Sequence, residues 1–478
     1  MEQRVRENRA VGVYLNHWYQ AGLREDNFIY RLFEVSQSVS FDALTQFWHN
    51  VIDHEPHFGW SANEDEDGTL RLSDRGSPTK GVVTEVKSNA KTDAKKFKIL
   101  KREFWKAKES VKFDGSAPLT RAVFLRFGDG SQFLILLLHH LVIDEVAMLL
   151  LVRDMEIHFS NATTPSYSSL RDSFDAYAEL TYKFIDSELD QQEDYWRSIV
   201  SCSHKNGLST DKLPSEEHLC TDRALFCLQT LFAPTFQEQG PDSVSSTEAK
   251  SYLGLVLEEF SKAQMAAIRQ LNAHSSVDIE GIFLWAISNA VKPWRTTDTL
   301  WMDVMTSGRH LFNNGMHLFG ARCSCVELCT LCLDYSNIQN GSDPIQITHE
   351  LQSQRKWIPS LGFGYHAMEL PNAECCGIND GPMPHPSIEF NFTAPVKEVF
   401  DREALNEKFR HTPFYLGPQY DPKLVKYDLY FGIDKPTGTD DWSLCIRYNT
   451  RKFSQAEGQE MAATLLRSVE DAAAALRN

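Results

Sequence analysis

In the first 160 residues, apolar runs typical of β-strands alternate with segments whose apolar residues recur every three or four positions, as in α-helices. Residues 29–35 are predicted to be a strand. Residues 132–140 are almost continuously apolar, which is typical of a strand buried on both faces of a sheet. In residues 41–54 the apolar side chains recur at intervals of three and four, so this segment is predicted to be an amphipathic helix. A second helix is predicted over residues 145–159. Strands and helices in alternation indicate an α/β fold.

A second alternating unit occupies the rest of the chain, after a long polar helix predicted over residues 168–199. The predicted strands are 252–257, 299–305, 326–333, 387–392, 427–431 and 442–448, and the predicted helices are 261–273, 279–291 and 454–476. The simplest arrangement is two α/β lobes of similar kind, residues 1–180 and residues 181–478, which join near residues 165–200.

Composition places the chain among globular proteins. Of its 478 residues 42% are hydrophobic, and the formal net charge is −17. This balance argues against nucleic acid or an anionic membrane as a partner, because both require clustered positive charge. The Lys-rich stretch 87–102 is therefore interpreted as a solvated helix face or loop, with a phosphate-attracting patch as the less favoured alternative. No apolar run approaches the roughly 20 residues of a membrane span and no signal-peptide core is visible, so a cytoplasmic protein is predicted.

The chain has ten cysteines, which are expected to be reduced thiols. Four of them, Cys323, Cys325, Cys329 and Cys332, lie within ten residues. Zinc sites use close Cys pairs, but normally two pairs separated by a longer loop. The pattern of residues 326–333 instead favours a buried strand in which free Cys packs as a small hydrophobe, so no metal is expected.

The candidate chemistry lies in a His followed four residues later by an Asp, because phosphate-loop, dinucleotide, serine-hydrolase and zinc-protease motifs are missing from the sequence. The spacing alone carries no information, since it occurs four times where about one occurrence is expected by chance. The pairs are His49/Asp53, His140/Asp144, His218/Asp222 and His274/Asp278. Only His140 and Asp144 stand where a buried strand ends and a helix begins, a position at which α/β proteins place reactive groups.

A His at this junction can act as a general base, because its unperturbed pKa is about 6.5 and the neutral ring accepts a proton. Three roles stay open for Asp144. It could orient the ring of His140, hold the loop by pairing with a distant Arg, or cap the following helix. A buried structural His beside a capping Asp is the non-catalytic alternative.

The sequence HHLVID at residues 139–144 resembles the HHxxxD signature of the chloramphenicol acetyltransferase-like superfamily. That group includes the condensation domains of nonribosomal peptide synthetases and stand-alone fungal-type acyltransferases. Further segments are similar to condensation-domain motifs and occur in the family's order from about residue 28 to the C-terminus. They are Phe113-Asp114, Pro118-Leu119, Arg121, Tyr195-Trp196, residues 303–309, Phe390-Asn391-Phe392, Tyr427-Asp428-Leu429, residues 446–449 and Phe453.

The resemblance implies an α/β fold of two chloramphenicol-acetyltransferase-like lobes, arranged as a V with a central tunnel. A thioester donor, either a CoA ester or the phosphopantetheine arm of a carrier protein, would enter from one face, and a small-molecule acceptor from the other. His140 would be the catalytic base, and Asp144 would form a structural ion pair with Arg309. The protein is expected to be a monomer without a tightly bound cofactor. The remaining site candidates are His139 as support, and Asn391 and His366 as tunnel or substrate contacts.

Two positions depart from the family's pattern. The residue after Asp144 is usually Gly in the family but here is Glu145, and Ala147 replaces a small hydroxyl residue. If Glu145 points inward, it could raise the pKa of His140, narrow the donor channel or attract an amine, and an atypical reaction becomes credible. If it points to solvent, it is a favourable acid at a helix N-terminus.

The expected function is therefore transfer of an acyl group from a thioester to a hydroxyl or amine of a secondary metabolite. The acidic surface would repel an acidic carrier protein, which leans the donor weakly towards free CoA. Two alternatives stay open: a stand-alone condensation or cyclisation enzyme with other chemistry, and a non-catalytic recruitment module. The presence of His140, Asp144 and Arg309 argues against the recruitment module.

Overall fold

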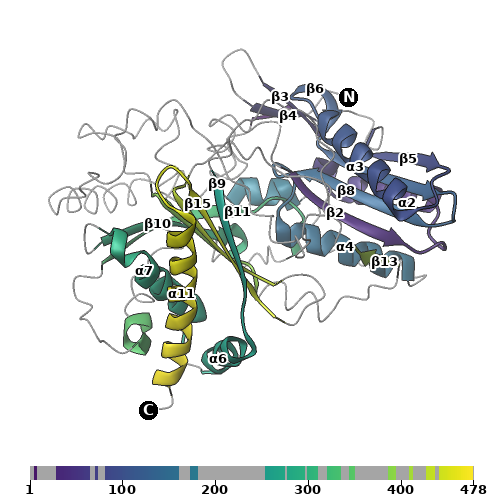
Figure 1. The fold of residues 1–478 in the computed structure, drawn as a ribbon. Helices are drawn as coiled ribbons and strands as arrows, with labels where there is room; N and C mark the ends of the chain where they lie inside the picture. Colours follow the sequence, from purple (N-terminus) through teal and green to yellow (C-terminus); the bar gives the residue numbers. More distant parts are fainter. Residues whose placement is uncertain are drawn as a thin grey trace.

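The computed structural model describes residues 5–7, 28–64, 70–73, 81–160, 173–180, 253–274, 277–295, 299–310, 320–334, 344–349, 386–394, 408–412, 427–435 and 441–476. These residues form two lobes, each built around its own β-sheet with helices packed against it (Figure 1). Two lobes of α/β type are therefore observed, as the alternating pattern predicts.

The N-terminal lobe is built on a five-stranded sheet with the order β13-β2-β8-β7-β5. Its strands are β2 (Phe28–Val35), β5 (Val83–Ser88), β7 (Thr120–Phe127), β8 (Gln132–His139) and β13 (Phe409–His411). β8 lies in the middle, pairs antiparallel with β2 and β7, and is buried along almost its whole length. The apolar run predicted over residues 132–140 is thus confirmed as a central strand, because a strand covered on both faces requires apolar side chains on both.

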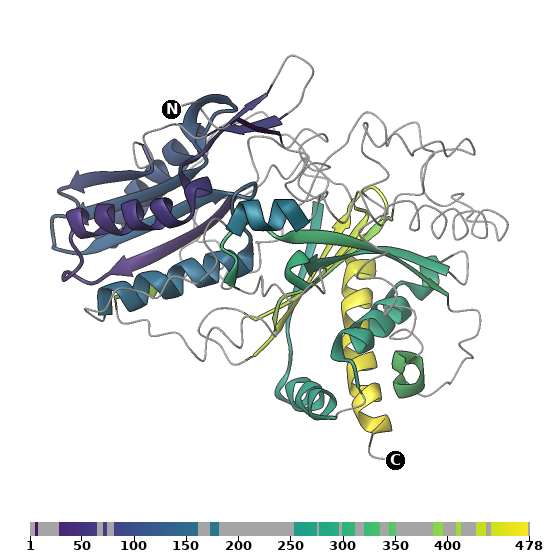
Figure 2. The same ribbon diagram turned by 180° about the vertical axis from the view of Figure 1, so that it is seen from behind.

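Helices cover both faces of this sheet. They are α2 (Phe41–His54), α3 (Asp93–Glu109) and α4 (Glu145–Ser160). α2 and α4 pack together on one face, where the rings of Phe47 and Phe159 lie 6.0 Å apart. α3 lies on the other face (Figures 1 and 2). There Phe104 contacts Tyr30 of β2. Both predicted helices of this lobe, residues 41–54 and 145–159, are therefore confirmed.

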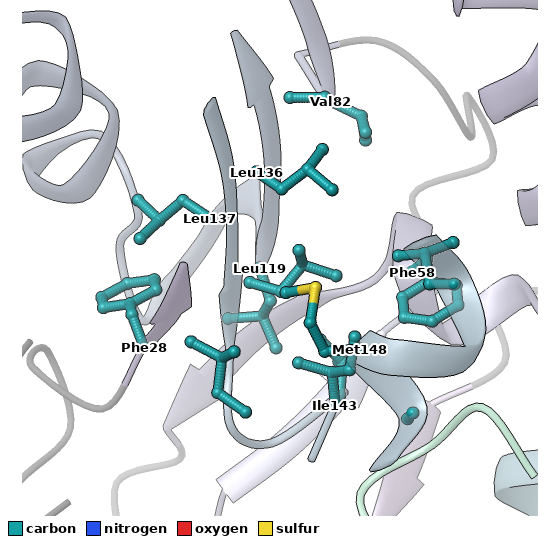
Figure 3. Packing of buried hydrophobic residues seen from close by; sticks show 14 of the residues in the cluster. Phe28, Phe58, Val82, Leu119, Leu136, Leu137, Ile143 and Met148 are labelled. Atoms are coloured by element: carbon teal, nitrogen blue, oxygen red, sulfur yellow. The ribbon is translucent and has the colours of Figure 1, made fainter. Parts of the chain in front are cut away.

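The core of the lobe reaches the end of β8. Figure 3 shows Leu119, Ile143 and Met148 in one apolar cluster with Leu136 of β8. All four side chains are fully buried, and burial of such a side chain is worth about 1.5–3 kcal/mol. Ile143 lies in the turn between β8 and α4, and Met148 lies at the start of α4. The core therefore fixes the backbone that carries the predicted site.

A small four-stranded sheet, with the order β1-β4-β3-β6, is not predicted by the sequence pattern. Its strands are β1 (Val5–Glu7), β3 (Ser61–Glu64), β4 (Leu70–Ser73) and β6 (Asp114–Pro118), and the short helix η2 (Pro56–Gly59) leads into β3. The strands are only three to five residues long and largely polar, so no hydrophobic period marks them. They exist through pairing with one another.

The C-terminal lobe is built on a six-stranded sheet with the order β11-β10-β12-β14-β15-β9. The strands are β9 (Leu253–Glu259), β10 (Thr299–Ser307), β11 (Val326–Asp334), β12 (Ile388–Phe392), β14 (Leu429–Asp434) and β15 (Ser443–Asn449), and the helices are α6 (Lys262–Ala273), α7 (Ile279–Val291), η5 (Lys292–Trp294) and α11 (Gln455–Ala475). The three long helices lie on one face of the sheet (Figure 1). All strands and helices predicted for this lobe are confirmed, with small shifts at their ends.

The two faces of the C-terminal sheet differ in character. The face under the helices is apolar and includes Phe390 and Phe431. On the opposite face, Asp303 of β10 accepts hydrogen bonds from the hydroxyls of Thr330 at 2.7 Å and Tyr427 at 2.6 Å. Buried polar groups are stable when they are hydrogen-bonded, so this face is held together by polar pairs rather than by apolar packing alone.

One segment crosses the predicted boundary between the lobes. β13 belongs to the second half of the chain, yet it pairs antiparallel with β2 and extends the sheet of the N-terminal lobe. Glu156 of α4 fastens it by accepting the N–H of Phe409 at 2.6 Å. The boundary at residue 180 itself stays a prediction, because residues 181–252 lie outside the described part of the chain.

Other expectations reach beyond the described residues. Residues 173–180 are helical, but most of the polar helix predicted over residues 168–199 lies outside the described part. The central tunnel stays a prediction. Within the described ranges, every helix is too short or too polar to cross a lipid bilayer.

Candidate active site

His140 lies in the turn that joins β8 to α4. β8 ends at His139, whose N–H donates to the carbonyl of Leu119 at 2.9 Å. The N–H of Val142 then donates to the carbonyl of His139 at 3.0 Å, which closes a tight turn before α4 begins at Glu145. The predicted position of His140 between a buried strand and a helix is therefore confirmed.

The ring of His140 is almost completely buried, with 2% of the residue exposed. Burial lowers its pKa from 6.5 to about 4, and the charges of Asp144 and Glu145, with nearby backbone groups, offset part of this effect. The imidazole is therefore neutral at physiological pH. Its Nδ1 makes no regular hydrogen bond with any described residue. A strongly shifted pKa makes His140 a candidate for proton exchange with a substrate.

Asp144 holds the turn through four donors. Its two carboxylate oxygens accept from Nη1 and Nη2 of Arg309 at 2.6 and 3.0 Å. The N–H groups of Cys325 and Ala147 each donate to it at 2.8 Å. The bond from Ala147 caps α4, so two of the three roles left open by the sequence apply together: capping the helix and pairing with a distant Arg. Asp144 acts on His140 through its charge.

Arg309 reaches this turn from the C-terminal lobe. It lies in the short helix η6 (Gly308–His310), directly after β10. Besides Asp144, its Nη2 donates to the carbonyls of Ala321 at 2.9 Å and Cys323 at 3.1 Å. The ion pair that the resemblance implies is thus formed, and it joins the two lobes beside His140.

Gly308 allows the close approach that places Arg309. Its N–H donates to the carbonyl of Cys325 at 2.5 Å. A Cβ at this position would collide with the hydroxyl of Tyr177 and would lie 2.7 Å from the carbonyl oxygen of Cys325. Any larger residue would push the strand end, and with it the guanidinium of Arg309, away from Asp144.

His139 supports the turn through contacts of its own. Its Nδ1 accepts the N–H of Leu141 at 3.2 Å. Its ring lies edge-on to the rings of Phe28 and Phe113, with centroid distances of 5.0 and 5.2 Å. These contacts fix the last residue of β8, and the supporting role of His139 in the site stays a prediction.

Glu145, the residue that departs from the family's pattern, is paired with Arg31 of β2. Its Oε1 accepts from Nη2 of Arg31, and 18% of the Glu145 side chain is exposed against 6% for Arg31. The carboxylate still raises the pKa of His140 in part. The simple choice between an inward and a solvent-facing Glu145 is therefore corrected: the carboxylate stays beside the site, and Arg31 balances its charge. A lone Arg in an apolar strand is the sequence signal for this pair.

Of the other site candidates, Asn391 belongs to the described part of the chain. Asn391 is buried on β12, where its Nδ2 donates to the hydroxyl of Tyr430 at 3.4 Å. Its predicted contact with substrate stays a prediction. His366 and the Tyr195-Trp196 pair lie outside the described residues.

Two of the remaining His–Asp pairs lie in the described part of the chain, on or beside helices. His49 and Asp53 are exposed on α2, as predicted. Asp278 caps α7, where it accepts the N–H groups of Glu280 and Gly281. The pair His218/Asp222 lies outside the described residues.

The cysteine cluster belongs to β11 and the segment before it. The predicted strand over residues 326–333 is confirmed as Val326–Asp334. Cys323, Cys325 and Cys329 are buried thiols outside any disulfide, and Cys332 is half-buried. In the described part of the chain, no group of three or more His, Cys, Asp or Glu side chains is arranged to hold a metal ion.

A second network that sequence reasoning missed joins the lobes further along α4. Asp154 accepts from Nε of Arg322 at 2.6 Å. The N–H of Arg322 donates to Ser173 at 3.0 Å, and its carbonyl accepts from Nε2 of His57 at 3.1 Å. Burial lowers the pKa of His57 to about 3, so this ring is neutral as well. The one signal in the sequence is a group of charged residues, Arg153, Asp154 and Glu156, that follows the apolar first half of α4.

Two segments that resemble family motifs meet in the C-terminal lobe. The N–H of Asn449 donates to the carbonyl of Asp428 at 2.9 Å, and the Asp428 carboxylate accepts from Lys452 at 2.6 Å. These residues join β14 to the end of β15. Their role in the described structure is to hold the sheet together.

Residues 28–477 match the family model of the condensation domain. The chain belongs to the condensation domain family. The epimerization domain from the third module of tyrocidine synthetase B has the same fold, with a TM-score of 0.71 at 15% identity over 98% of both chains. The condensation domain of the Monacolin K polyketide synthase gives a TM-score of 0.65 at 11% identity over 96% of both. The expectation of two chloramphenicol-acetyltransferase-like lobes is confirmed.

Two curated relatives are similar over more than half of this condensation-family chain. One of the subunits of linear gramicidin synthase, from Brevibacillus parabrevis, is 23% identical over 297 residues, which are 60% of this chain and 3% of that relative. Gramicidin S synthase 1 of Brevibacillus brevis is 21% identical over 311 residues, which are 64% of this chain and 25% of that protein. The chain thus spans a small part of each relative.

Proposed function

We propose that this chain transfers an acyl or peptidyl group from a thioester to an amine or hydroxyl, with His140 as the general base. The observation that carries the proposal is the neutral, buried ring of His140 in a turn that the Asp144–Arg309 pair clamps between the two lobes. Membership of the condensation domain family supports the reaction class. The similarity to peptide synthases supports a biosynthetic role and a phosphopantetheine-bound donor, with a free CoA ester as the alternative.

In this mechanism the neutral ring of His140 takes the proton of the acceptor as the acceptor attacks the thioester carbonyl. The tetrahedral intermediate then collapses, the C–S bond breaks, and the proton passes to the leaving thiolate. The ring therefore ends each cycle neutral. The negative charges of Asp144 and Glu145 favour the transient imidazolium, because both raise the pKa of His140.

The substitution His140→Ala tests the base. The probes are one acyl group on CoA and the same group on a carrier domain, offered with a panel of amines and alcohols while free thiol is measured. Turnover is expected to fall by about 10²–10⁴-fold, the usual contribution of general base catalysis. Full activity of the variant would refute the role of His140.

A matched control is available in the same lobe. His49 has the same spacing to an Asp but is exposed on α2, so His49→Ala is expected to leave turnover unchanged. Thermal unfolding of both variants by circular dichroism separates a loss of chemistry from a loss of folding. An equal loss in both variants would point to a general effect on the protein.

A second candidate is proton-transfer chemistry without acyl transfer, such as ring closure of a carrier-bound chain. The observation that favours it is the extra carboxylate of Glu145 beside His140. In D₂O, this candidate requires that deuterium enters the carrier-bound chain without release of free thiol, and that Glu145→Gln suppresses the exchange. Thiol release that survives Glu145→Gln would exclude it.

A further inference from the structure

α3 carries a row of exposed cations on its solvent side. Lys95, Lys98, Arg102 and Lys106 follow one another at intervals of three and four residues, so they line one face of the helix. We call these four residues the cationic stripe. Three further exposed lysines flank it: Lys91, Lys101 and Lys112.

The attachment of α3 to the lobe does not depend on the stripe. Leu100 and Phe104 are buried against the sheet on the opposite side of the helix. Lys96, which is not part of the stripe, anchors the start of the helix by pairing with Asp129 at 2.9 Å. The stripe therefore projects from a helix that is already held in place.

The stripe keeps its positive charge. Arg102 and Lys106 share a single carboxylate, that of Glu103, at 2.6 and 3.9 Å, while their own side chains are 65% and 78% exposed. Between residues 91 and 112 the exposed charges are seven cations and two acids, the acids being Asp93 and Glu109. This local excess is opposite in sign to the net charge of −17, so an anionic partner would be drawn to α3 and repelled elsewhere.

The shape of the stripe favours an extended partner. Its four residues lie over eleven positions of helix, which correspond to about 16 Å. A single phosphate group is bound by cations and backbone N–H groups that converge on one point. Cations in a line instead fit a surface that carries a line of acids, such as the acidic face of a protein helix.

The C-terminal end of α3 leads to the candidate active site. Arg121, at the start of β7, donates through Nε to the hydroxyl of Ser110, the residue that ends the helix, at 2.8 Å. Three residues later, the ring of Phe113 contacts that of His139 at 5.2 Å. A partner that lies along α3 would therefore have one end beside the β8–α4 turn.

We propose that the cationic stripe docks the acidic face of a carrier domain, whose phosphopantetheine arm then presents its thioester to His140. This inference rests on the proposed function. It reverses the preference for free CoA that the net charge alone indicates, because the charge of α3 differs from that of the protein as a whole.

Charge reversal of the stripe tests the docking surface in the full chain. The variant is Lys98→Glu, Arg102→Glu and Lys106→Glu together. The matched control reverses three exposed cations of the C-terminal lobe, as Lys262→Glu, Arg269→Glu and Arg467→Glu together. Both variants change the net charge equally, so they differ only in where the charge lies.

The probes are an acidic acyl carrier domain without its arm, the same domain carrying an acyl-phosphopantetheine, and the same acyl group on CoA. The affinity of the wild-type protein for the bare carrier domain is expected to fall with added salt. The affinity of the stripe variant for the same domain is expected to be lower than that of wild type by about tenfold or more. The kcat/KM for the carrier thioester should fall alike, while that for the CoA thioester should stay within about twofold of wild type, because only the carrier contacts the stripe.

Three results would overturn the docking proposal. The first is an unchanged affinity of the stripe variant for the carrier domain, and the second is an equal loss of that affinity in the control variant. The third is an equal fall of kcat/KM for the CoA thioester in the stripe variant, which would mean that the stripe binds the phosphates of the donor. Binding of the bare carrier domain is measured without turnover. Binding that depends on the stripe but without acyl transfer from either thioester would therefore count against the proposed function and not against the docking surface.

Discussion

Two buried Arg–Asp pairs join the C-terminal lobe to α4, and a buried histidine accompanies each. Arg309 meets Asp144 at the start of the helix, four residues after His140. Arg322 meets Asp154 further along the same helix, and its carbonyl binds His57. Ten residues separate the two Asp, which correspond to about 15 Å of helix. The C-terminal lobe therefore holds α4 at two separate points.

The surroundings of the two histidines differ. The Nε2 of His57 is hydrogen-bonded to the carbonyl of Arg322, and its ring lies 4.3 Å from Phe58 and 5.7 Å from Phe174. The Nδ1 of both rings makes no hydrogen bond of normal geometry within the described part of the chain. The two rings differ in their position, because His140 lies in the turn between β8 and α4 and not in an aromatic cluster. The same combination of ion pair and buried histidine thus serves packing at one end of α4 and, we propose, proton transfer at the other.

The largest effect is expected from Arg309→Met, which leaves Asp144 buried and without its cation. The free energy of unfolding should fall by about 3–5 kcal/mol, the usual cost of removing one partner of a buried pair. Turnover per folded molecule should fall as well, because the turn that carries His140 loses its clamp. Urea unfolding and thiol release measure the two effects. A variant with wild-type stability and turnover would show that the Arg309–Asp144 pair does not hold the turn that carries His140.

Arg322→Met is expected to cost a similar free energy of unfolding, about 3–5 kcal/mol, for the same reason. Its turnover per folded molecule should stay within about threefold of wild type, because His57 and Asp154 do not border the reacting groups. The measurement is kcat at a temperature where both proteins are fully folded. A loss of kcat equal to that of Arg309→Met would remove the distinction between the two pairs.

The pH dependence of stability sharpens the comparison of the histidines. Folding lowers the pKa of His140 from 6.5 to about 4 and that of His57 from 6.5 to about 3. Between these values and pH 6.5 the unfolded chain binds more protons than the folded chain, so stability falls as the pH falls. At pH 5 each histidine is expected to cost about 2 kcal/mol relative to pH 8.

His140→Ala removes one of these contributions. Its loss of stability between pH 8 and pH 5 should therefore be smaller than that of wild type by about 2 kcal/mol. Urea unfolding at both pH values provides the measurement. The same pKa predicts that wild-type turnover persists below pH 6.5 and declines as the pH passes through about 4, where the ring becomes protonated. An identical pH dependence in wild type and variant would contradict a lowered pKa of His140.

The smallest effect is expected from Glu145→Gln. Glu145 raises the pKa of His140, so its removal should shift the acid limb of the pH–rate profile to lower pH, by less than about one unit. The free energy of unfolding should fall by less than in Arg309→Met. Gln keeps an oxygen that accepts from the buried Arg31, and the Glu145 side chain is partly exposed. Rate profiles of the two proteins from pH 3.5 to 8 check the shift. A limb that moves to higher pH would contradict the electrostatic role of Glu145.

The elements around the site could be predicted because their signals are local. The apolar run of β8 and the helical period of α2 depend only on neighbouring residues, and the junction between β8 and α4 selects His140 from four His–Asp pairs. Arg309 could be assigned only from the resemblance to a family, since nothing in its neighbourhood marks its partner.

Other features could not be predicted because they depend on residues far apart in the chain. β13 has three residues and exists through its pairing with β2. Arg31 and Arg322 find their carboxylates across 114 and 168 positions of sequence. No periodicity reports such contacts, because the side chains meet only after both lobes have formed.

The sequence by itself determined the strands, the helices, the two-lobe class and the place of His140, since all of these follow from apolar periodicity and from an ordered set of motifs. The tertiary structure alone decided which charges meet, that Glu145 is balanced by Arg31, that the ring of His140 is neutral, and that α3 carries a positive face on an acidic protein. The physical reason is that a pKa and an ion pair depend on burial and on the distance between remote groups, and folding sets both.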